Sequence, residues 1–97
     1  MDLNALMKQA KQMQDDLKKT QAALEEKIYE GTSNGIVIKI NGKNEAQEVS
    51  IPRELMDDKD MLQDMILIAF NNAVEAAAKD RDEQIGAATK GLNIPGM

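Results

Sequence analysis

One stretch of the chain, residues 61–78, limits the possible folds most strongly, because it predicts a helix that is apolar on nearly every side. On a helical wheel of about 100° per residue, the polar residues Asp64, Asn71 and Glu75 share one narrow stripe. Almost every other position in the stretch is apolar. A helix with this pattern must be buried on almost all sides. Either the rest of the chain or a second copy of it has to supply the cover.

A second helical pattern lies at the beginning of the sequence. Apolar residues alternate in spacings of three and four from Leu3 to Leu24, with Ala10 and Thr20 as weak positions. This spacing predicts an amphipathic helix over 3–27. Its apolar seam is narrow, so the helix meets a partner along a line, as in a coiled coil.

Between the two helical patterns the period changes to an alternating one. Two Asn-Gly dipeptides, Asn34-Gly35 and Asn41-Gly42, are flanked by β-branched residues and are typical of tight hairpin turns. The sequence therefore predicts an antiparallel meander that ends at Pro52, with strands near 28–33, 36–41 and 45–51.

The second helix is predicted over 58–85, with Asp57 and Asp60 at its N-terminus, where the helix dipole favours carboxylates. Glycines and a proline in 86–97 predict a helix stop and a flexible tail. The fold class is α+β, an α-β-β-β-α chain forming a single domain over 1–97.

Length and composition together predict a homodimer. A helix of about 24 residues is about 36 Å long, whereas a compact chain of this size has a radius of gyration of about 12–13 Å. Both helices must therefore overhang the rest of the chain. Three short strands and one narrow-seamed helix cannot cover the apolar second helix, whereas a second copy of the chain related by a two-fold axis can. The residues expected at the dimer interface are the apolar ones of the second helix: Met65, Ile66, Leu67, Ile68, Ala69, Phe70, Ala73 and Val74.

Catalytic and metal chemistry find no support in the residues. The chain has no cysteine and no histidine, so its serines have no imidazole to activate them. Gly42-Lys43 lacks the hydroxyl residue that follows in a phosphate-binding loop. Asp58 and Asp60 do not begin a calcium loop, because Gln63 replaces the required glycine. We expect no enzyme activity, metal, cofactor or small-molecule substrate.

The beginning of the sequence has no signal-peptide pattern. The longest apolar run, Met65–Phe70, is far shorter than the roughly 20 residues of a membrane span. We expect a cytoplasmic protein that does not bind membranes.

The net charge of −5 is unevenly distributed. Residues 1–24 carry four lysines against three aspartates, whereas residues 53–64 carry two basic and five acidic side chains. Lys11 and Lys18 share one line of the first helix and could contact phosphates without reading sequence. From these residues alone, ordinary surface pairing of the lysines with Asp15 is the favoured interpretation.

Five sequence blocks, in order, resemble the YbaB/EbfC family of bacterial nucleoid-associated proteins: LMKQAKQMQ, IVIKING, EVSIPREL, DKDMLQDMILIAFNNA and GLNIPG. The blocks span nearly the whole chain, and residues 58–73 are the most specific of them. The resemblance implies a tweezer-like homodimer that binds double-stranded DNA with low sequence specificity and acts in nucleoid organisation or gene regulation. By position, it also implies phosphate contacts first from Lys8, Lys11, Lys18 and Lys19, and then from Lys79, Arg81 and Lys90.

Two features of this chain reduce its positive surface. Some relatives have basic residues in the third strand, where this chain has Ala46-Gln47-Glu48, and its second helix has few basic residues. The acidic isoelectric point, near 4.6, favours a competing interpretation. This alternative is a dimeric adaptor for DNA-repair or replication proteins that binds DNA weakly or not at all.

Overall fold

The computed structural model describes residues 2–90 and has the element order α-β-β-β-α, which confirms the predicted fold class. A short 3₁₀ helix that the sequence patterns did not predict joins the sheet to the last helix. The elements are α1 (Leu3–Glu26), β1 (Ile28–Ser33), β2 (Ile36–Asn41), β3 (Ala46–Ser50), η1 (Arg53–Asp57) and α2 (Lys59–Lys90).

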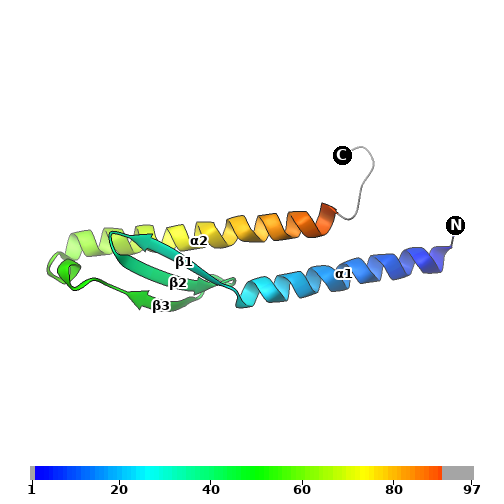
Figure 1. Ribbon diagram of the computed structural model, residues 1–97, viewed down its shortest axis with the longest axis horizontal. Helices are drawn as coiled ribbons and strands as arrows, with labels where there is room; N and C mark the ends of the chain where they lie inside the picture. Colours follow the sequence, from blue (N-terminus) through cyan, green and yellow to red (C-terminus); the bar gives the residue numbers. More distant parts are fainter. Residues whose placement is uncertain (1, 91–97) are drawn as a thin grey trace.

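The molecule is elongated, as Figure 1 shows. Its extents are 70 × 26 × 14 Å and its radius of gyration is 19.5 Å, well above the roughly 12–13 Å of a compact chain of this length. The first half of α2 lies along the sheet, while α1 extends past the sheet on the same side as the C-terminal half of α2 (Figure 1). Both helices therefore overhang the sheet, as their lengths predicted.

The sheet is antiparallel, in the order β1-β2-β3. The first hairpin turns at Asn34 and Gly35, which have φ angles of 48° and 89°, as the Asn-Gly signal predicted. In the second hairpin the positive φ, 63°, belongs to Asn44 and not to Gly42. A Cβ atom at Gly42 would collide with the carbonyl oxygen of Leu24, so this glycine is required by the close approach of α1.

The core lies between the sheet and α2. Its buried side chains are Tyr29, Ile36, Ile38, Ile40, Ala69, Ala73 and Ala77. The three alanines recur every four residues and form a smooth stripe along α2. The stripe rests on Gly31 of β1, where a Cβ atom would collide with the backbone of Ala69 and Ala73. Small residues on both sides thus bring the helix into direct backbone contact with the sheet.

The ends of α2 differ from the prediction. Asp58, not Asp57, caps the helix, because its Oδ1 accepts a hydrogen bond of 3.1 Å from the Met61 N–H. The predicted end at 85 is wrong, since α2 continues through Gly86 to Lys90. A glycine inside a helix costs only about 1 kcal/mol relative to alanine, so the flanking helix formers outweigh it. The rest of the predicted tail, 91–97, lies outside the described residues.

Candidate nucleic-acid interface

The four lysines of α1 lie on one side of an exposed arm. Lys8, Lys11, Lys18 and Lys19 are all exposed. On a helical wheel they fall within an arc of about 100°, and the centre of this arc lies about 160° from the apolar seam that ends at Leu24. Leu24 is buried at the base of the arm. The lysines therefore point away from the rest of the molecule.

These lysines carry charge that the described structure does not neutralise. Within residues 2–90 the ion pairs are Lys27–Asp80 and Lys39–Glu48, and neither involves a lysine of α1. Asp15, the expected partner of Lys11 and Lys19, lies on the same side of α1 but forms an ion pair with neither of them in the described structure.

The cations of α2 do not form a comparable surface. Lys79 is exposed and Arg81 is half-buried. The two lie about 160° apart on a helical wheel, so they face different sides of α2. The side chain of Lys90 lies outside the described part of the structure. The structure thus brings the first group of predicted residues together and separates Lys79 from Arg81.

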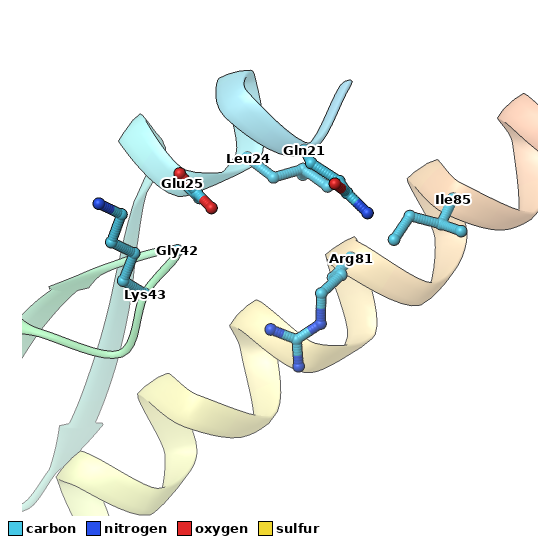
Figure 2. Close-up of a pocket in the computed structure, with 7 residues that line it drawn as sticks. All are labelled: Gln21, Leu24, Glu25, Gly42, Lys43, Arg81 and Ile85. Carbon is cyan, nitrogen blue, oxygen red and sulfur yellow. The ribbon is translucent and has the colours of Figure 1, made fainter. Parts of the chain in front are cut away.

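Arg81 lies instead in a cleft of about 360 Å³ at the base of the arm. Figure 2 shows this cleft, which α1, the β2–β3 turn and α2 form together. Lys43 of the turn also lines it, with Glu25 of α1 nearby. The sequence did not point to Lys43 because its local pattern indicates only a hairpin turn, and its place in the lining of this cleft depends on the tertiary fold.

Acidic side chains gather at the opposite end of the molecule. On the sheet face turned away from α2, Glu30 and Glu48 flank Lys39 in register, and Lys39 pairs with Glu48 at 3.4 Å. The exposed acids of η1, of the junction residue after it and of the first turns of α2 lie beyond this row: Glu54, Asp57, Asp58, Asp60 and Asp64. The sheet end would therefore repel a polyanion, and the α1 arm offers the less acidic approach.

Several residues expected at a dimer interface are used inside the chain. Ala69 and Ala73 have no exposed surface within one chain, because they pack on β1. The sulfur of Met65 accepts hydrogen bonds from Ser33 Oγ at 3.1 Å and Asn34 Nδ2 at 2.9 Å. The wheel pattern alone could not separate the face that packs on the sheet from a face left for a partner.

A smaller apolar surface remains open. Leu67, Phe70 and Val74 lie on one flank of α2, opposite the flank where Asn72 donates a hydrogen bond to the Thr32 carbonyl of β1. Leu67 is 60% exposed, and Val49 of β3 is 51% exposed, since α2 packs on β1 and β2 but not on β3 in the described structure. We call Leu67, Phe70, Val74 and Val49 the flank patch. Ile68, 44% exposed, and the half-buried Ile66 lie outside it.

One polar cluster, which we call the latch, joins the arm base to α2. Lys27 Nζ lies 2.7 Å from Asp80 Oδ2, and the Tyr29 hydroxyl donates a hydrogen bond of 2.7 Å to the same oxygen. Burial raises the pKa of Tyr29 to about 12, and the neighbouring Asp80 carboxylate adds to this effect. The hydrogen bonds from Lys27 and Tyr29 lower the pKa of Asp80. Sequence patterns do not indicate this cluster, because Asp80 lies 53 residues from Lys27 and 51 residues from Tyr29 along the chain.

Within residues 2–90, no group of three or more histidine, cysteine or acidic side chains could hold a metal ion. No helix in the described residues has the length and apolarity needed to cross a membrane. The candidate site is a projecting helix whose exposed lysines have no ion-pair partner in the part of the chain that the structure describes, a geometry suited to an extended polyanion.

A projecting helix with four lysines along one side fits a nucleic-acid-binding class of protein, and the comparisons with known proteins identify the class. The chain belongs to the YbaB/EbfC DNA-binding family, whose model matches residues 1–92. This confirms the family that the sequence blocks predicted.

Two relatives named nucleoid-associated protein match nearly the whole chain. One, from Alkaliphilus metalliredigens, is 43% identical over 100 residues, covering 99% of this chain and 88% of that protein. The other, from Clostridium novyi, is 41% identical over 101 residues, covering 100% of this chain and 89% of that protein.

The fold also matches a solved structure. The crystal structure of an uncharacterized protein from Helicobacter pylori is similar with a TM-score of 0.75 at 21% sequence identity, covering 90% of this chain and 96% of that chain. At this identity the likeness supports the fold alone.

Proposed function

We propose that this protein binds double-stranded DNA as a homodimer with low sequence specificity and acts in nucleoid organisation and gene regulation. In this proposal it is a non-enzymatic protein of the cytoplasm, located at the nucleoid. The observation that carries the proposal is the row of exposed lysines on α1, which have no ion-pair partner among residues 2–90, in a member of a DNA-binding family.

The spacing of the lysines suits the phosphate backbone. Lys8 and Lys19 are separated by about 16 Å along the helix axis, at about 1.5 Å per residue. That length corresponds to about five phosphates of one strand, at about 3.4 Å of duplex axis each. Lysine contacts to phosphate fix position and carry no sequence information, which accounts for low specificity.

Homodimerisation is supported by the surfaces that one chain leaves open. The flank patch exposes apolar side chains beside the core, and the arm exposes Leu3, Leu6 and Met7. A two-fold axis through the flank patch makes it self-complementary, so that the same residues serve both copies. Two arms would then hold the duplex, which raises affinity through effective concentration.

Binding to duplex DNA at rising salt concentration tests the proposal. With four to six phosphates neutralised per dimer, log affinity should fall against log salt with a slope of about −4 to −5. Reversing the charge of Lys8, Lys11 and Lys18 to Glu should weaken binding to all duplex sequences about equally and leave the sedimentation of the dimer unchanged. Absence of binding even at low salt would contradict the proposal.

The acidic sheet end favours a second candidate, the adaptor for DNA-repair or replication proteins. The five acids of residues 53–64 are all exposed, and only Arg53 and Lys59 oppose them within that stretch. The adaptor predicts that neutralising Asp57, Asp58 and Asp60 abolishes partner capture. It also predicts that charge reversal on α1 leaves that capture intact, so paired variants distinguish the two functions.

A further inference from the structure

The α1 arm makes almost no contact with the rest of the chain beyond its last two turns. Leu24 is the one fully buried side chain among residues 3–26, and every residue from 3 to 16 is exposed. The position of the arm lysines therefore depends on how the last turns of α1 are held. Because residues 3–16 make almost no contact with the rest of the described chain, they add almost nothing that would fix the direction of the arm.

Three sets of contacts hold the base of the arm, and the first is the direct packing of the last turns of α1 on α2. On the hairpin side, the Gly42 N–H donates a hydrogen bond of 3.1 Å to the Glu25 carbonyl, and the missing Cβ of Gly42 lets the turn approach Leu24. On the α2 side is the latch, in which one carboxylate oxygen of Asp80 binds both Lys27 and Tyr29. Lys27 directly follows the last residue of α1, and its backbone is extended.

The geometry of the latch is better suited to setting the direction of the α1 arm than to catalysis or to stabilising the fold as a whole. Tyr29 is buried and belongs to the sheet core, so it fixes Asp80 relative to the rigid part of the molecule. Gln84 donates a weak hydrogen bond of 3.5 Å to the other carboxylate oxygen. Lys27 also lies 5.9 Å from the centre of the Tyr29 ring, so the arm's first linker residue is held by both partners.

The length of the arm amplifies any change at its base. Lys8 lies about 28 Å from Lys27 along the helix axis. A tilt of about 15° at Lys27 would displace Lys8 by about 7 Å. That displacement equals about two phosphate steps along the duplex axis. A modest loss of orientation would therefore break the match between lysines and phosphates.

We infer that Asp80 is a positioning residue for DNA binding, which fixes the direction of the α1 arm by holding Lys27 against the sheet core. The inference rests on the proposed function. The change in DNA affinity that it predicts has an unusual sign. Removing an acidic charge from a DNA-binding protein ordinarily strengthens binding, because the repulsion of phosphate falls. Removing the charge of Asp80 should instead weaken binding.

The test pairs Asp80→Asn with the matched control Asp82→Asn. Asp82 lies two residues away on α2, is exposed, and makes no hydrogen bond or ion pair within residues 2–90. Both substitutions remove one charge, and only the first removes the charge that holds Lys27. We expect Asp80→Asn to lower duplex affinity about threefold to tenfold at fixed salt, and Asp82→Asn to leave affinity unchanged or raise it.

A second measurement follows the arm without DNA. The chain has no cysteine, so Gln9→Cys with Glu83→Cys places two spin labels, one on the arm and one on α2. Labelled chain diluted with excess unlabelled chain gives the distance distribution within one chain by pulsed electron spin resonance. Asp80→Asn should broaden this distribution, and Asp82→Asn should leave it narrow. The double exchange Lys27→Asp with Asp80→Lys should bring the width of the distribution most of the way back to that of the unsubstituted protein.

The outcomes separate the inference from the function on which it rests. Stronger binding by Asp80→Asn, or weaker binding with an unchanged distance distribution, would overturn the positioning role, as would a broad distribution with unchanged affinity. If the unsubstituted protein bound no duplex, the proposed function would fail, whereas broadening in Asp80→Asn would still show that the latch directs the arm. If Asp80→Asn does not fold, the charge exchange decides the question by the same two measurements.

Discussion

The sheet end and the arm end of this molecule are built on opposite principles. At the sheet end, α2 lies in backbone contact with β1 through glycine and alanine. The core isoleucines of β2 are almost inaccessible to solvent. At the arm end, α1 buries one side chain and exposes four lysines. The contacts that stabilise the fold are thus concentrated at the sheet end, and the lysines proposed to bind DNA are concentrated at the arm end. The latch connects the two ends. Substitutions should therefore separate folding from DNA affinity.

The largest effect is expected at the contact between β1 and α2. In Gly31→Ala the new Cβ would collide with the backbone of Ala69 and Ala73, and no flexible side chain can move aside. Overpacking of this kind typically costs about 1–3 kcal/mol, and a backbone collision places it at or above the upper end. Urea denaturation should show this loss. Gly86→Ala is the matched control, since a Cβ there meets nothing within 4 Å.

The arm should respond in the opposite way. Lys8→Glu, Lys11→Glu and Lys18→Glu together should lower duplex affinity about a hundredfold or more, because phosphate neutralisation is replaced by repulsion. The free energy of unfolding should change by no more than about 0.5 kcal/mol per substitution, as is usual for exposed sites. Titration with duplex and urea denaturation of the same sample would measure both. A destabilised triple variant would show that the two regions are not independent.

The flank patch is expected to control dimerisation. Leu67→Glu places a charge on the exposed apolar flank of α2 and should shift sedimentation from dimer to monomer. Ile68→Glu is the matched control, since Ile68 has similar chemistry but lies on the other side of the helix. Dissociation by both variants, or by neither, would argue against the flank patch as the interface.

The smallest effect concerns the pH dependence of the latch. The pKa of Tyr29 rises from 10.0 to about 12 in the folded state, so the folded protein keeps a proton that the unfolded chain loses. This contribution to stability is complete below pH 10 and is lost as the pH rises towards 12. The pKa of Asp80 is lowered, so its contribution is lost as the pH falls through that lowered pKa. Urea denaturation across pH 9–12 should show a shallower decline for Tyr29→Phe than for the unsubstituted protein.

Much of the fold followed from local patterns. The period of about 3.6 in α1 and α2, the alternation between them and the first Asn-Gly turn are properties of neighbouring residues, so the elements could be predicted. The end of α2 could not, because Gly86 is a weak breaker that its neighbours outweigh. The requirement at Gly42 was also hidden, because it comes from the approach of Leu24 and not from the turn itself.

The candidate site was less predictable than the fold. The family resemblance pointed to the lysines of α1, and the structure then showed that they lack ion-pair partners among residues 2–90. A helical wheel could not tell that Ala69 and Ala73 face β1 while Leu67 faces outward. The place of Lys43 in the cleft and the meeting of the three latch residues both depend on tertiary contacts, which a single sequence does not reveal.

Salt titration of a variant with three arm lysines neutralised shows whether the α1 lysines hold the duplex. The triple variant Lys8→Gln, Lys11→Gln and Lys18→Gln keeps the arm polar and removes three positive charges from each chain. If these lysines neutralise phosphates, the slope of log affinity against log salt should fall in magnitude from about 4–5 to about 1 or less. A slope equal to that of the unsubstituted protein would show that the duplex is held elsewhere.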